Sequence, residues 1–184
     1  MQWRNSSSRY GAVSILMHWV VALAVFALFA LGFWMVGLNY YSSWYRTAPE
    51  LHKSIGILLF ALMLARLLWR LFSPMPAVLA SHGRWTRLAS RVGHGFLYLG
   101  LFGVMISGYL ISTADGRPIE VFGLFSVPAL ISGIPNQEDV AGWIHEYLAW
   151  ALVIFAGLHG LAALKHHFFD RDATLLRMLG RKSD

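Results

Sequence analysis

The sequence predicts an all-α integral membrane protein, a four-helix bundle with both termini in the cytoplasm. Of its 184 residues, 57% are hydrophobic and 13% are charged, whereas a soluble domain carries about a quarter charged residues. Apolar runs cover residues 12–37, 52–72, 92–112 and 141–166, each close to the roughly 20 residues that span a membrane. Because they lack the alternation of barrel strands, we expect helices.

Turn-forming residues separate the runs and leave one domain over residues 1–184. Residues 39–49 are rich in turn and aromatic residues, Pro74 and Pro76 end the second run, and Pro118, Pro128 and Pro135 interrupt the stretch before the fourth. The tail, residues 170–184, alternates leucine and methionine with arginine. That pattern fits either a short interfacial helix on the cytoplasmic leaflet or a basic flank of the last span.

Lysine and arginine lie mainly on one side of the predicted spans, and this bias sets the orientation. The basic residues on the side of the termini are Arg4, Arg9, Arg66, Arg70, Arg84, Arg87, Arg91, Lys165, Arg171, Arg177, Arg181 and Lys182. The other side has Arg46, Lys53 and Arg117. The positive-inside rule therefore places both termini in the cytoplasm. This topology also explains the net charge of +6, so no nucleic-acid partner is expected.

Histidines are the informative residues, because the chain has no cysteine. Disulfides, iron–sulfur clusters, thiolate zinc sites and covalently attached haem are thereby excluded. His145 and His159 lie 14 positions apart, just under four helical turns, so both project from nearly the same face. By depth in the membrane, His18 matches His159 and His52 matches His145.

Two imidazoles facing each other across a bundle are what a six-coordinate b-type haem requires. A polar side chain at membrane depth needs a partner, which favours a functional role for four histidines matched in pairs. Small residues near them leave room for a flat macrocycle, although close helix packing is the alternative reason for each. These are Gly56, Gly142, Gly157 and Gly160.

Sequence motifs around the histidines carry a family resemblance. They are His18-Trp19, Glu50-Leu51-His52-Lys53-Ser54-Ile55-Gly56, Ser107-Gly108-Tyr109, and His159 followed by Lys165-His166-His167. Over nearly its whole length the chain resembles the bacterial cytochrome b561 family of multi-pass inner-membrane proteins. The resemblance implies two b-type haems, with His18 and His159 binding the cytoplasmic-side haem and His52 and His145 the periplasmic-side one.

Cations are expected near the haem propionates, which are anionic. Lys53 and Arg46 are candidates near the outer haem and Arg9 near the inner one, and each is alternatively an interfacial anchor. The apolar residues of the outer loop either cover the outer haem as a lid or anchor in the lipid interface. These are Phe122, Leu124, Phe125, Val127, Leu130 and Ile131.

A quinone pocket is a further hypothesis for the cytoplasmic end. His94 and His166 lie at the ends of their spans near Arg66 and Arg91, and histidine is suited to proton transfer at neutral pH. The alternative is an interfacial cluster that contacts lipid phosphates. His82, in a basic loop, is expected to be solvated.

The predicted function is transmembrane electron transfer between the quinone pool, ubiquinone for example, and a periplasmic redox protein or superoxide. With both axial positions of each iron filled by histidine, electrons must move by outer-sphere transfer. Superoxide is a candidate electron donor because the family resembled includes superoxide oxidases. With that activity the protein would be a membrane oxidoreductase. The alternatives are a haem-bearing membrane subunit of a larger dehydrogenase or hydrogenase, and a metal-ion transporter lined by histidines.

Overall fold

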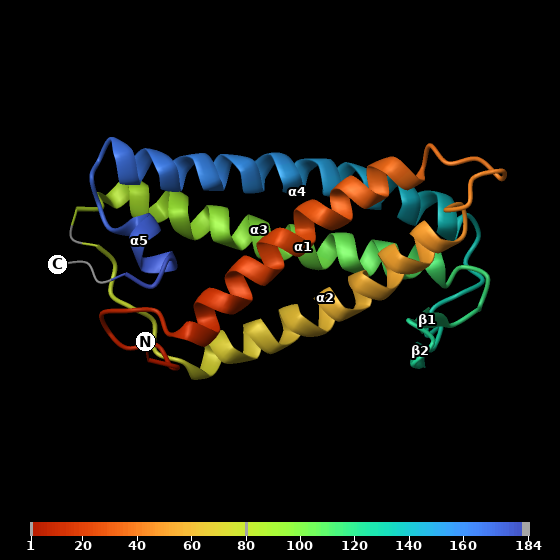
Figure 1. Ribbon diagram of the computed structural model, residues 1–184, viewed down its shortest axis with the longest axis horizontal. Helices are drawn as coiled ribbons and strands as arrows, with labels where there is room; N and C mark the ends of the chain where they lie inside the picture. The colour runs from red at the N-terminus through yellow and green to blue at the C-terminus, as the bar shows by residue number, and fades with distance from the viewer. Residues whose placement is uncertain (1, 80, 182–184) are drawn as a thin grey trace. The chain divides into compact units, whose positions relative to one another are not determined.

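A computed structural model describes residues 2–79 and 81–181 (Figure 1). Within these residues the elements are α1 (Ala12–Met35), α2 (Thr47–Phe72), α3 (Arg84–Ser112), β1 (Ile119–Val121), β2 (Phe125–Val127), α4 (Gln137–Phe168) and α5 (Thr174–Met178). Helices α1 to α4 are each long and apolar enough to cross a membrane. The predicted fold class, an all-α membrane protein built as a four-helix bundle, is confirmed. Lys182 and the tail beyond it lie outside the described residues.

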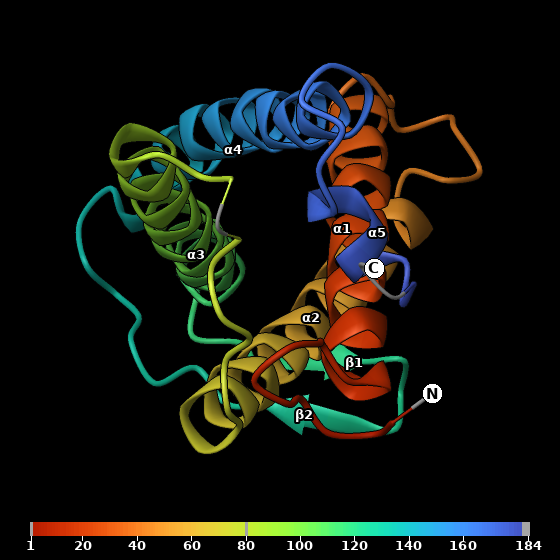
Figure 2. The same cartoon turned by 90° about the vertical axis from the view of Figure 1, so that its left-hand side faces the viewer.

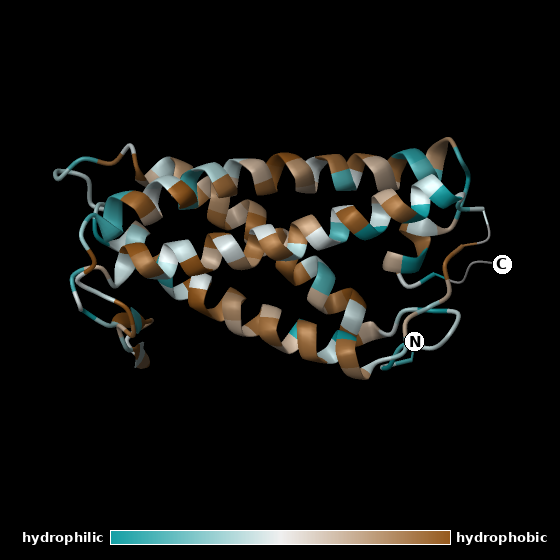
Figure 3. Cartoon of the chain, turned by 180° about the vertical axis from the view of Figure 1, so that it is seen from behind, coloured by the Kyte–Doolittle hydropathy of each residue, from teal (hydrophilic) through white to brown (hydrophobic). Residues whose placement is uncertain are grey.

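The membrane helices do not end where the apolar runs end. Helix α2 begins at Thr47 rather than 52, α3 at Arg84 rather than 92, and α4 at Gln137 rather than 141, while α1 stops at Met35. Polar residues extend the helices at their ends, because backbone hydrogen bonding continues past the hydrocarbon core. The helix dipole favours the acidic first turns of α2 and α4. Figure 3 shows hydrophilic residues gathered toward the helix ends and in the loops.

The chain forms two compact units. Unit 1 comprises Met1–Ala22, Leu62–Tyr98 and Ile154–Asp184, and unit 2 comprises Leu23–Ala61 and Leu99–Val153. Each of α1 to α4 therefore contributes one stretch to each unit.

Side-chain hydrogen bonds tie the parts of unit 1 together. The indole Nε1 of Trp69 on α2 donates to Ser14 Oγ on α1 at 3.0 Å. On α1, Trp19 Nε1 donates to the carbonyl of Met178 at 2.8 Å, which holds α5 beside α1 (Figure 2). The helical part of the tail is thus only Thr174–Met178, shorter than the interfacial helix considered from the sequence.

In unit 2, the loop after α3 folds into a short antiparallel hairpin of β1 and β2. Ile119 and Val121 are buried, and Ser54 on α2 fixes the hairpin. The Ser54 hydroxyl donates to the Glu120 carbonyl at 3.3 Å and accepts from the Phe122 amide at 3.1 Å. Five of the six apolar side chains considered for a lid are exposed, and Val127 is half-buried. This exposure favours the interfacial role over the lid.

Aromatic contacts also join helices of unit 2. Phe29 on α1 meets the edge of Trp150 on α4 at a centroid distance of 4.8 Å. Phe60 on α2 meets Phe102 on α3 at 5.8 Å. Edge-to-face pairs of this kind add about 1 kcal/mol beyond the burial of their area, so they help to fix the helices that carry the histidines.

Candidate functional site

His52 and His145 face each other in unit 2. His52 lies in the second turn of α2 and His145 in the first half of α4, with ring centroids 6.1 Å apart and ring planes at 73°. Two imidazoles on opposite sides of one iron need a centroid separation of about 6.4 Å. This value follows from an iron–nitrogen bond of about 2.0 Å and about 1.2 Å from nitrogen to ring centre. The separation therefore fits an axial pair.

A backbone hydrogen bond orients the His145 ring. Its Nδ1 lies 2.8 Å from the carbonyl oxygen of Val104 on α3, with Ser107 Oγ at 3.4 Å. Since a carbonyl only accepts, the proton is on Nδ1 and Nε2 keeps its lone pair. Metal-ligating histidines usually make this second contact, which fixes the tautomer and increases the basicity of the ligand.

Glycines on two helices allow the backbone to approach these rings. A Cβ on Gly108 would lie 2.9 Å from His145 Cε1, and one on Gly32 would lie 3.2 Å from His52 Cε1. Among the described residues, His52 Nδ1 is buried without a hydrogen-bond partner. The glycines singled out from the sequence behave differently, because a Cβ on any of them meets no atom within 4 Å: Gly56, Gly142, Gly157 and Gly160.

We expect Gly108→Ala to disturb the His145 ring. The added methyl group forces the ring off the Val104 carbonyl, at a cost of about 1–3 kcal/mol in the free energy of unfolding. A weaker Nδ1 hydrogen bond makes the imidazole less basic, so the midpoint potential of the haem it binds should rise. A redox titration of the purified protein measures this shift. Gly100→Ala on the same helix is the control, because its Cβ makes only an ordinary contact at 3.6 Å.

His18 and His159 face each other in unit 1. His18 on α1 and His159 on α4 have ring centroids 6.4 Å apart at an interplanar angle of 64°. This separation also fits two ligands of one iron, by the same geometry. His94 on α3 lies closer to His159, at 5.2 Å, with the rings edge to face. The site in unit 1 is therefore a cluster of three histidines.

Arg66 on α2 completes this cluster. Its Nη2 lies 3.3 Å from His18 Nδ1, and because a guanidinium only donates, Nδ1 accepts in this arrangement. Coordination of iron through Nε2 requires the opposite tautomer, so Arg66 must then release the ring. The released guanidinium is a strong donor for a carboxylate such as a propionate.

The residues predicted for a quinone pocket do not form one group. His94 and Arg66 lie at the His18–His159 cluster. Arg91 is exposed on α3, and no hydrogen bond or ion pair joins it to the others in the described part of the chain. His166 lies with Asp170 and Asp172 instead, its Nδ1 being 2.6 Å and 3.4 Å from their Oδ2 atoms.

His82 is not solvated as expected. Its side chain is only 14% exposed, and its Nε2 lies 3.0 Å from Asp172 Oδ2. Burial by itself raises the pKa of the Asp172 carboxyl, but hydrogen bonds from Thr174 and His82 outweigh this effect and hold the pKa below its usual range. The basic loop therefore turns one of its side chains inward to an ionised carboxylate.

The cations expected near the propionates differ in burial. Lys53 directly follows His52 on α2 and is half-buried, whereas Arg46, in the segment before α2, is exposed. Arg9 is exposed in the segment before α1. Arg66, which the sequence assigned to the quinone, is the cation that contacts a histidine of the pairs.

The chain is similar to known proteins over almost its whole length. The family model "Prokaryotic cytochrome b561" matches residues 9–181. The chain is 55% identical over 183 residues to "Cytochrome b561 homolog 2" of Escherichia coli (strain K12), covering 100% of this chain and 97% of that protein. It is 30% identical over 178 residues to "Probable superoxide oxidase CybB" of Yersinia pestis, covering 95% and 97%. It is 28% identical over 181 residues to "Cytochrome b561 homolog 1" of E. coli, covering 95% and 99%. The protein therefore belongs to the prokaryotic cytochrome b561 family, whose members bind b-type haem and transfer electrons in the inner membrane.

Proposed function

We propose that the protein passes electrons across the inner membrane through two b-type haems, between the quinone pool and a periplasmic donor or acceptor. The observation that carries this proposal is the spacing of the two histidine pairs, 6.1 Å and 6.4 Å between ring centroids. His52 and His145 hold one haem and His18 and His159 the other. Both termini lie in the cytoplasm, so the first haem is the periplasmic one.

The haem supplies one-electron chemistry when bound, and the chain determines where that chemistry occurs. If both histidines of each pair bind the iron, no position on the metal would be left for oxygen or a substrate, and electron transfer would be outer-sphere. The Val104 carbonyl holds the His145 ring in the ligating tautomer. Arg66 pairs with a propionate in unit 1, and Lys53 and Arg46 do so in unit 2.

Quinol oxidation at the cytoplasmic end requires groups that accept protons. His94 is the strongest candidate, because it lies 5.2 Å from the proposed ligand His159. Its Nδ1 is 2.7 Å from the Ser90 carbonyl, so Nε2 keeps a lone pair for a proton. Arg66, which contacts His18 in the same cluster, has donors enough for both a propionate and a quinone oxygen. Arg91 and His166 make no hydrogen bond or ion pair with this cluster among the described residues.

Superoxide is the second candidate for the periplasmic substrate. It is favoured by the 30% identity to the Yersinia pestis relative named as a probable superoxide oxidase. The cations Arg46 and Lys53 near His52 would attract an anion to the edge of the outer haem. In this reaction two superoxide anions would each give up one electron and leave as oxygen, and the two electrons with two protons would reduce one ubiquinone to ubiquinol. The histidine pairs would hold the haems that supply this one-electron chemistry.

The test is electron transfer in proteoliposomes that contain the haem-loaded protein and ubiquinone. We expect a red protein with a low-spin b-type spectrum and two haems per chain, reduced by ubiquinol and by externally generated superoxide. A dehydrogenase subunit would instead purify with partner chains. A colourless protein that moves zinc or iron into the vesicles would contradict the proposal and favour the transporter.

A further inference from the structure

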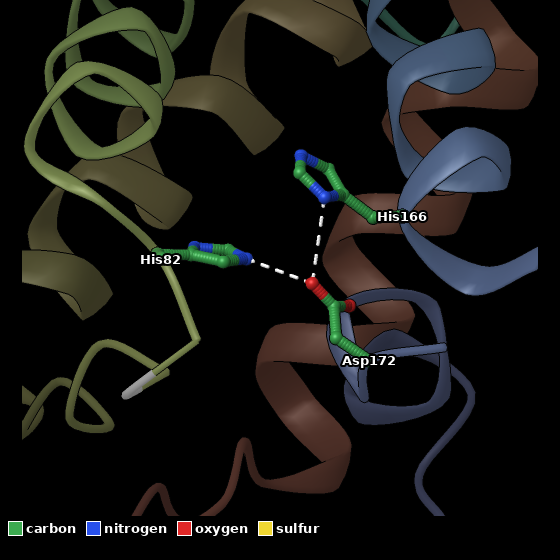
Figure 4. A group of neighbouring side chains, drawn as sticks. All are labelled: His82, His166 and Asp172. Atoms are coloured by element: carbon green, nitrogen blue, oxygen red, sulfur yellow. Dashed lines mark hydrogen bonds and ion pairs between the residues drawn. The ribbon is translucent and has the colours of Figure 1, made fainter. Parts of the chain in front are cut away.

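His82, His166 and Asp172 converge in unit 1, and none of them is a residue assigned to a haem. Figure 4 shows the two imidazole rings facing the same carboxylate. Asp172 Oδ2 lies 3.0 Å from His82 Nε2 and 3.4 Å from His166 Nδ1. The three ligand atoms all lie within 4.8 Å of one another, so they surround a common point.

The three residues come from separate parts of the chain. His82 lies in the segment between α2 and α3, His166 in the last turn of α4, and Asp172 between α4 and α5. Their side chains are 14%, 19% and 6% exposed. Clusters of acidic residues on a protein surface are common, but two imidazoles and one carboxylate largely removed from water form a ligand set that transition metals prefer.

The local backbone directs Asp172 toward the rings. Its amide donates to the carbonyl of His166 at 3.1 Å, and the preceding Arg171 has a φ of +52°, a conformation that L-residues adopt at some cost. The amide of Thr174 donates to Asp172 Oδ1 at 2.8 Å. With Oδ1 occupied, Oδ2 is the oxygen turned to the histidines, a supporting contact of the kind that orients metal ligands.

The His166 ring lies beside two carboxylates. Its Nδ1 lies 2.6 Å from Asp170 Oδ2 and 3.4 Å from Asp172 Oδ2. The contact with Asp170 is an ion pair when His166 is protonated, and the buried Nδ1 has no partner of hydrogen-bond geometry among the described residues. Asp170 is engaged by Lys165, whose Nζ is 2.6 Å from the same oxygen. Of the two contacts, the one with Asp172 Oδ2 at 3.4 Å has the spacing expected of two ligands of one cation.

We propose that His82, His166 and Asp172 bind one zinc ion that joins the segment before α3, the end of α4 and the segment before α5. In tetrahedral zinc sites with bonds of about 2.0–2.1 Å, the ligand atoms lie about 3.3 Å apart, close to the 3.0 Å and 3.4 Å found here. Water takes the fourth position. The site is independent of the haems and acts as a clip that fixes the C-terminal tail to the rest of unit 1.

The experiment uses the haem-loaded protein in detergent, purified without a polyhistidine tag and treated with a chelator. Zinc is titrated by isothermal calorimetry, and the haem absorbance is followed to verify that the protein stays intact. We expect one zinc ion per chain, together with slower amide hydrogen exchange over α5. Asp172→Asn and His82→Ala should each weaken zinc binding by at least about 100-fold, because even supporting contacts account for 10–100-fold.

His167→Ala is the matched control, because it removes the neighbouring histidine and leaves the three ligands in place. It should bind zinc as the unmodified protein does. Absence of saturable zinc binding would overturn the proposal and leave an ion pair of His82 with Asp172. Binding retained by both ligand variants, with intact haem spectra, would overturn it as well, since the zinc would then be bound elsewhere.

Discussion

His52→Ala is expected to halve the haem content of the purified protein and to abolish electron transfer across the membrane. Its ring faces His145 at 6.1 Å, and without it the iron between them keeps one protein ligand. His18 and His159 belong to unit 1 and are unaffected. Haem assays should therefore fall from two haems per chain to one, and a redox titration should lose one of its two components.

A chemical rescue separates the loss of a ligand from a general loss of structure. The alanine leaves a space the size of an imidazole ring, so added imidazole should restore a low-spin spectrum if His52 supplies only the ligand. His167→Ala serves as the control and should keep both haems. An unchanged haem content in the His52 variant would show that this histidine does not bind haem, and the electron-transfer proposal would then lose one of its two sites.

Depth along a helix can be read from a sequence, which is why the histidine pairs could be predicted to meet. Each residue advances a helix by a fixed rise of 1.5 Å, and hydropathy gives the boundaries of the spans to within a turn or two. His18 therefore had to lie near the level of His159, and His52 near that of His145. The structure brings both pairs together, while their ligation of iron stays a prediction.

Rotation about the helix axis and close approach between helices could not be read in this way. The contact of Arg66 with His18 and that of His94 with His159 depend on which helices are neighbours. A glycine against a histidine looks, in sequence, like any other glycine of a membrane helix. For this reason the sequence points to Gly56 and Gly142, whereas the glycines at which a Cβ would press against His52 or His145 are Gly32 and Gly108.

Short elements and distant loop contacts were also beyond the sequence. Strands of three residues, such as β1 and β2, are too short to show an alternating pattern. His82 and Asp172 are 90 residues apart, and nothing local indicates that a basic loop turns inward to a carboxylate. Hydropathy likewise gave the apolar core of each span but missed the polar first turns of α2, α3 and α4.

Replacing His18 and His94 separately should give opposite results, although both rings lie near His159. His18→Ala is expected to lose one haem, because its ring lies 6.4 Å from that of His159, at the distance of an axial pair. His94→Ala is expected to keep both haems, because a separation of 5.2 Å is an ordinary edge contact, too short for an iron between the rings. Haem content and the low-spin spectrum of the two variants measure this difference.

The rate of haem reduction by ubiquinol should depend on His94. If His94 accepts the proton of quinol, His94→Ala should slow reduction by ubiquinol about 100-fold, the usual effect of removing a general base. Reduction by dithionite, which needs no proton acceptor, should be unchanged. Loss of a haem in the His94 variant with retention in the His18 variant would instead make His94 the partner of His159. In that case Arg66 could keep its contact with His18 Nδ1 at 3.3 Å in the haem-loaded protein. His18 would then bind no iron, so its Nδ1 would not need to carry a proton.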